Sequence, residues 1–286
     1  MRPRRSTSRR STSRRFAGFV APARARPGLW RLGAGAGVAI AGWLAAVALL
    51  LHGASDRRAE ALLFLLSFGG LVLGLALALA LLHRRRLGSL LGPGGLDLRA
   101  VATGAGACLA IVAASGAAAC LLAPPERGIP LDAWGRLLPI AVPLVALQCA
   151  AEELFFRGYL LQGLAARFRS PLVWWLLPGL FFGVLHWNPD SGAPQLTVAS
   201  ATLLGLLLAD ITARTGNLSA AIGIHIANNL AALLVLASPS SLDALALLVL
   251  VPGPAGVGPL ARLDLATTLA AWGAWLAVRR QSGASM

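Results

Sequence analysis

The chain has 286 residues, of which 57% are hydrophobic and 13% are charged, and its formal net charge is +14. A soluble domain of this size is excluded, because the apolar residues come in runs long enough to span a bilayer. All basic residues are Arg, and ten of them lie in the first 31 residues. This segment lacks the interleaved aromatic residues of a nucleic-acid surface, so the expected partner is the lipid bilayer and not a nucleic acid.

Residues 1–28 are rich in Arg, Ser, Thr and Pro, and the pattern Ser-Thr-Ser-Arg-Arg occurs at 6–10 and again at 11–15. Such a composition cannot bury a core. It predicts a disordered cytoplasmic tail that orients the protein and contacts anionic lipid.

The rest of the chain predicts about eight transmembrane helices, so the expected fold class is all-α and polytopic. The predicted spans are 32–51, 61–82, 100–123, 133–169, 172–187, 195–213, 218–237 and 263–278. The fourth is entered through Asp132 as N-cap and ends before Pro171. Segment 242–251 is apolar but too short to cross, which predicts an interfacial or re-entrant segment.

The arginine-rich loops alternate with loops that are neutral or acidic. The basic ones are the tail, 84–99, 167–169, 214 and 279–280. By the positive-inside rule these loops and both termini are expected in the cytoplasm. The expected location is the inner (plasma) membrane of a bacterial cell.

Two adjacent carboxylates and an arginine, Glu152, Glu153 and Arg157, interrupt the fourth span. Ionisable side chains at bilayer depth are costly and are retained with partners, usually for a function. At 100° per residue these three side chains and Phe156 share one arc of an α-helix, and Glu153 and Arg157 form an i,i+4 pair. A structural ion pair is the alternative interpretation.

Further polar residues lie in two later spans. His186 follows Phe182 by four residues in the fifth span, and His225 is followed by Asn228 and Asn229 in the seventh. Glu153 lies 17 residues before the turn at Ser170 and His186 lies 16 after it. At ~1.5 Å per residue both come ~25 Å from that turn, so the two side chains reach one level. This predicts a polar intramembrane site formed by helices four, five and seven.

The three motifs Glu-Glu-x-x-Phe-Arg-Gly at 152–158, Phe-x-x-x-His at 182–186 and His-x-x-x-Asn at 225–229 resemble those of the CPBP intramembrane proteases. That family includes the type II CAAX prenyl endopeptidases and the bacteriocin-immunity (Abi) proteins. The resemblance covers about 134–238. Together with the composition, this predicts a tail (1–28), N-terminal transmembrane helices (29–131), a CPBP-like catalytic core (132–238), and an interfacial segment with the last helix (239–286).

The expected activity is hydrolysis of a peptide bond in a membrane-associated protein or peptide. Peptide hydrolysis needs an activated water, a site for the oxyanion and a proton for the leaving amine. Glu152 is the expected base, with Glu153 held ionised by Arg157. His186 is expected to share the work on the water or to protonate the leaving amine, and the resemblance implies the first Glu and the first His as the essential pair. His225 and Asn229 are the expected oxyanion donors, with Phe156, Phe182 and Asn228 in support.

Whether the mechanism uses a metal ion stays open at this point. Glu152, His186 and His225 would make a legitimate catalytic zinc set with one open position for water. The chain lacks His-Glu-x-x-His, so the favoured mechanism uses a glutamate-activated water and requires no cofactor.

Two other function classes remain open. A transporter also places ionisable residues at mid-membrane, although it would usually show internal repeats, and none is visible. A non-proteolytic immunity or scaffold protein could retain the same motifs without turnover.

Overall fold

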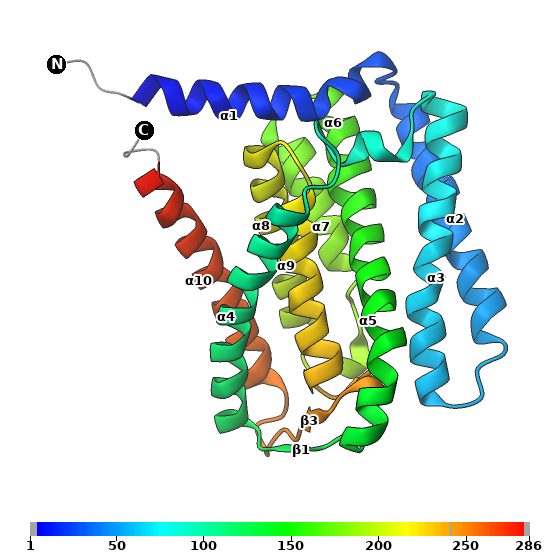
Figure 1. The fold of residues 1–286 in the computed structure, drawn as a ribbon, viewed down its shortest axis with the longest axis vertical. Helices are drawn as coiled ribbons and strands as arrows, with labels where there is room; N and C mark the ends of the chain where they lie inside the picture. Colours follow the sequence, from blue (N-terminus) through cyan, green and yellow to red (C-terminus); the bar gives the residue numbers. More distant parts are fainter. Residues whose placement is uncertain (1–4, 241, 283–286) are drawn as a thin grey trace.

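The structure, a computed structural model, describes residues 5–240 and 242–282. Figure 1 shows long helices standing side by side, with helix α1 lying across one end of the bundle. Within the described part, five helices are long and apolar enough to cross a membrane. The predicted all-α, polytopic membrane class is confirmed, and the chain is an integral membrane protein.

All eight predicted spans fall on helices, several of which continue through a π-helical turn (η2, η4, η5 and η7). In chain order they are α2 (Leu29–Leu51), α3 (Arg57–Ala78) with η2 (Leu79–His83), α4 (Leu98–Leu122), α5 (Leu131–Glu153) with η4 (Leu154–Leu161) and α6 (Gln162–Arg167), η5 (Leu172–Leu176) with α7 (Leu177–Val184), α8 (Pro194–Thr215), α9 (Ser219–Leu230) with η7 (Ala231–Val235), and α10 (Gly258–Ser282). Short 3₁₀ turns lie between them at η1 (Ala21–Ala25), η3 (Leu87–Leu90), η6 (Pro189–Ser191) and η8 (Asp243–Leu245). The segments Leu172–Val184 and Ser219–Val235 are apolar but shorter than the five spanning helices.

Local sequence signals set several helix ends. The carboxylates of Asp56 and Asp97 accept hydrogen bonds from the first N–H groups of α3 and α4, at 2.9–3.1 Å. Gly216 ends α8 with φ 72°, a left-handed conformation that favours glycine. Asp132 does not cap α5 as expected, because the helix begins one residue earlier and the side chain pairs with Arg136 at 2.8 Å.

The N-terminal segment differs from the expected disordered tail. The described part of it forms α1 (Arg5–Val20) followed by η1. Phe19 and Val20 are almost fully buried, and the Phe16 ring lies 4.7 Å from the Trp174 ring, centroid to centroid. The arginine-rich composition outweighs these few apolar residues in the sequence. Their burial nevertheless contributes enough free energy to hold the segment against the bundle.

A small three-stranded sheet closes the opposite end of the bundle (Figure 1). Its strands are β1 (Pro125–Arg127), β2 (Leu236–Ala237) and β3 (Leu248–Leu250), in the order β1-β3-β2. The apolar segment expected to be interfacial or re-entrant therefore supplies β3, which joins the ends of α4 and α9. Strands of two or three residues carry no period-2 pattern that a sequence could show.

Helix α5 lies inside the bundle, between α3 and α9. The other neighbours are α2 against α3, α4 against α9, and α10 against α8 and α4. Helices α2 and α3 approach closely at Gly42 and Gly74, where a Cβ on Gly74 would lie 2.7 Å from the Val38 carbonyl oxygen. Small residues permit this approach where no hydrophobic effect drives helices together in lipid.

The two ends of the bundle differ in charge. Helix α1, the α3–α4 connection, α6 and the C-terminal ends of α8 and α10 lie at one end, and the sheet lies at the other (Figure 1). All the predicted cytoplasmic loops that the structure describes therefore meet at the α1 end.

Candidate functional site

The first motif lies where α5 becomes π-helical. Glu152 and Glu153 end α5, and the next eight residues form η4. The expected uninterrupted α-helix is therefore wrong at this point, and the arc drawn at 100° per residue does not hold beyond Glu153. π-Helical turns are rare and frequently occur at functional sites.

A buried ion pair stands at the centre of the site. Arg157 Nη1 donates to Glu153 Oε1 at 2.7 Å, and the two side chains are 2% and 0% exposed. The predicted i,i+4 pair is present because the offset of four residues still brings the groups together at the start of η4. His225 of α9 places Nδ1 2.8 Å from the same Glu153 oxygen. Since a carboxylate accepts, Nδ1 carries the proton, and its hydrogen bond joins α9 to α5.

Glu152 lies on the other side of the His225 ring. His225 Nε2 is 3.5 Å from Glu152 Oε2, within ion-pair range but without a hydrogen bond. The two side chains are 2% and 11% exposed. A continuous chain of polar groups therefore runs from Arg157 through Glu153 and His225 to Glu152. Glu152 is more exposed to solvent than His225.

Three buried atoms of this chain have no hydrogen-bond partner among the described residues: Glu152 Oε2, Glu153 Oε2 and Arg157 Nη2. Buried polar atoms are almost always hydrogen-bonded in folded proteins. A buried polar atom without a hydrogen bond is costly in a membrane core. Such atoms usually occur at a site that binds a polar ligand.

The Phe182 ring joins the three motifs. It lies 4.6 Å from the His186 ring, 6.0 Å from the His225 ring and 5.1 Å from the Phe156 ring, centroid to centroid. Arg157 Cζ lies 4.6 Å from the Phe182 centroid, a cation–π contact. The predicted convergence of helices four, five and seven is therefore present in the structure.

His186 follows the end of α7 and is exposed. Its Nδ1 lies 2.8 Å from the Phe182 carbonyl oxygen. A carbonyl only accepts, so Nδ1 carries the proton and Nε2 keeps its lone pair for another partner. Among the described residues, His186 thus meets the site through the Phe182 ring, and no hydrogen bond joins it to Glu152 or His225.

Sequence reasoning missed Gln148, one helical turn before Glu152. Gln148 is 7% exposed, and its Oε1 accepts from Asn229 Nδ2 at 2.9 Å. Asn229 Oδ1 in turn accepts from Asn228 Nδ2 at 3.2 Å. The predicted oxyanion donor is therefore held by a second polar tie between α5 and α9. A polar residue at i−4 from Glu152, on the same helical face, was the signal that could have identified it.

No group of three or more His, Cys, Asp or Glu side chains in the described ranges is arranged to hold a metal ion. Both ring nitrogens of His225 face carboxylates, and Nδ1 of His186 is bonded to the backbone. In this arrangement the possible zinc ligands Glu152, His186 and His225 do not converge on one point.

Residues 134–231, about a third of the chain, match the family described as type II CAAX prenyl endopeptidase Rce1-like. This confirms the predicted resemblance over the segment that carries all three motifs. The chain is also similar to the uncharacterized protein YyaK of Bacillus subtilis (strain 168), with 41% identity over 97 residues. That alignment covers 33% of this chain and 32% of YyaK, so it spans about a third of each. No solved structure matches the chain.

Proposed function

We propose that this protein is an intramembrane endopeptidase that hydrolyses a peptide bond of a membrane-associated protein or peptide. The observation that carries the proposal is the carboxylate of Glu152. It is nearly buried, has an oxygen without a hydrogen bond, and faces His225 inside a segment that matches an endopeptidase family.

Glu152 is the general base. Glu153 pairs with Arg157 and orients the His225 ring through Nδ1. His225 Nε2 and Glu152 Oε2 lie 3.5 Å apart without a hydrogen bond, so Glu152 Oε2 is left for the attacking water. In the reaction Glu152 takes a proton from water as the oxygen attacks the carbonyl carbon, and returns it to the amine as the C–N bond breaks.

The remaining groups position the water and the oxyanion. Nε2 of His186 can accept from the attacking water, because Nδ1 is committed to the Phe182 carbonyl. Asn229 donates one N–H to Gln148, and its second N–H is the one proposed for the oxyanion. A protonated His225 Nε2 would be another donor. These roles require no metal; a zinc-dependent mechanism is the alternative that a chelator tests.

Asn229→Ala is expected to lower the cleavage rate by about 10²–10³, the usual cost of removing one oxyanion donor. Asn228→Ala serves as the control, because Asn228 donates to Asn229 Oδ1 and is not assigned to the oxyanion. Its rate should fall less. Rates of the purified variants on the same substrate measure both effects. Equal rates for Asn229→Ala and wild type would remove Asn229 from the oxyanion site.

The function itself is tested by comparing the peptides cleaved in membranes that contain the protein with those in membranes that lack it. Peptides that depend on the protein, and that the purified protein also produces, would support the endopeptidase. Their absence, with proton-coupled solute uptake in proteoliposomes, would identify a transporter. Absence of both would leave the immunity or scaffold class.

We further propose that the α1 end of the bundle faces the cytoplasm of a bacterial cell, with the inner membrane as its location. The support is the grouping of the arginine-rich loops at that end (Figure 1). Cationic loops near membrane spans favour the cytoplasmic side.

A cysteine at Arg86 is expected to resist an impermeant thiol reagent in intact cells, and one at Glu126 in β1 is expected to react. Both positions are exposed and lie at opposite ends of the bundle. The background must lack Cys108, Cys120 and Cys149, which are free thiols. The reverse labelling pattern would invert the proposed topology.

A further inference from the structure

A pocket lies at the α1 end of the bundle, away from the proposed catalytic groups. It encloses about 260 Å³ of space between atoms, including the part open to solvent, but its interior has room for only about one water molecule. Its walls come from the segment after α1, the end of α3 and the helix that carries the first motif. The lining residues are Ala23, Arg26, Pro27, Gly28, Leu32, His83, Arg85, Tyr159 and Gly163.

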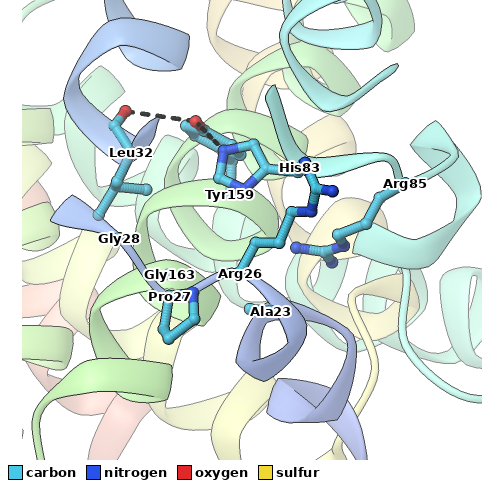
Figure 2. A pocket seen from close by; sticks show the side chains of 9 residues that line it. All are labelled: Ala23, Arg26, Pro27, Gly28, Leu32, His83, Arg85, Tyr159 and Gly163. Carbon is cyan, nitrogen blue, oxygen red and sulfur yellow. Dashed lines mark hydrogen bonds between the residues drawn. The ribbon is translucent and has the colours of Figure 1, made fainter. Parts of the chain in front are cut away.

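The pocket is cationic and has no acidic lining residue. Figure 2 shows the side chains of Arg26 and Arg85 reaching toward each other beside the His83 ring. No ion pair in the described ranges involves either arginine, since Arg26 bonds to the Leu82 carbonyl and Arg85 to Gln162 and Ser89. Two guanidinium groups thus share one small space without a counter-charge.

Arg85 is the more constrained of the two. Its Nη2 donates to Gln162 Oε1 at 2.6 Å, and Gln162 is fully buried. Burial lowers the pKa of the Arg85 guanidinium to about 10, because the charged form is partly stripped of water. Partly buried charges are normally compensated by a partner of opposite sign.

A polar frame holds the pocket open on its inner side. Tyr159 donates its hydroxyl proton to the carbonyls of Arg31 and Leu32 at 3.1 and 3.2 Å. The same oxygen therefore accepts from His83 Nε2 at 2.9 Å. The wall is preorganised, so binding does not have to order it.

We propose that a phosphate group binds at the solvent-open side of this pocket through Arg26 and Arg85. The planar guanidinium matches the geometry of phosphate oxygens, and two such groups neutralise one phosphate. The pocket follows directly on the span Arg57–His83, and residues that flank a membrane span are expected near the phospholipid headgroups. Basic pockets between helices on the cytoplasmic side of membrane proteins bind such headgroups. A lipid phosphodiester and free phosphate are the two sources of this chemistry.

The test uses the full chain, purified in neutral detergent and stripped of lipid, with bound lipid counted by native mass spectrometry. Phosphatidylglycerol should bind in preference to phosphatidylcholine and raise the melting temperature. Arg85→Gln and Arg26→Gln should each weaken that binding roughly tenfold or more, as expected for loss of a charge-assisted hydrogen bond. Arg85→Lys should retain part of it.

Arg86→Gln is the matched control, because Arg86 is an exposed neighbour that does not line the pocket and its loss changes the net charge equally. Its binding should equal that of wild type. Displacement of the lipid by inorganic phosphate assigns the site to the free ion, and retention assigns it to the headgroup. If all three Gln variants bind alike, or if phosphatidylcholine binds wild type equally well, the site does not exist. Because only binding is measured, the outcome is independent of peptidase activity.

Discussion

Glu152→Gln is expected to abolish peptide cleavage while the fold survives. General-base catalysis contributes about 10²–10⁴ in rate, and the amide cannot take the proton from water. The amide matches the carboxylate in size and can donate to His225 Nε2, so the polar chain between α5 and α9 is retained. Cleavage of a peptide identified in the membrane comparison, measured with purified protein, gives the rate.

Glu126→Gln provides the control for this change, since Glu126 lies in the exposed strand β1, in the sheet at the end of the bundle. It should cleave like wild type. His186→Ala should also be inactive, as the second member of the expected pair. A chelator that abolishes activity, restored by added metal, with His225→Ala as severe as His186→Ala, would instead establish the zinc mechanism. If Glu152→Gln cleaves like wild type, neither mechanism holds.

Arg157→Ala is expected to destabilise the protein by roughly 3–5 kcal/mol, because removing one partner of a buried pair leaves the other charge uncompensated. Here the charge left behind is Glu153, which is fully buried. The substitution also removes the cation–π contact with Phe182. The measurement is unfolding in detergent, together with the amount of protein inserted in the membrane.

Arg136→Ala is the matched control, because Arg136 and Asp132 form an i,i+4 pair in α5, the helix that also carries Glu153. Their side chains are 73% and 68% exposed, so water screens the pair and the unfolding midpoint should stay close to that of wild type. Equal losses in the two variants would contradict the buried role of Arg157. In a double-mutant cycle Glu153→Gln should recover part of the loss in Arg157→Ala, since no unpaired carboxylate remains.

Two further elements show the limit of sequence reasoning at the local scale. The composition of α1 did not predict a packed helix, because its many arginines outweigh the three apolar side chains that contact the bundle. The π-helical turn η4 was hidden because its residues have the same hydrophobic character as those of an ordinary helix. Gly158 lies within η4, and only the fold shows why a glycine is needed there. A Cβ at this position would lie 2.9 Å from Leu90 Cβ.

The sequence by itself determined the membrane class, the helical segments and the pairing of Glu153 with Arg157. These follow from local rules: in lipid the backbone must satisfy its own hydrogen bonds, and an offset of four residues brings two side chains together on a helix. The tertiary structure alone decided which atoms His225 and Asn229 contact. Their partners, Glu153 and Gln148, lie 72 and 81 residues away in the chain. Contacts at that separation depend on the rotation and depth of each helix in the bundle, which are set by packing against several neighbours at once.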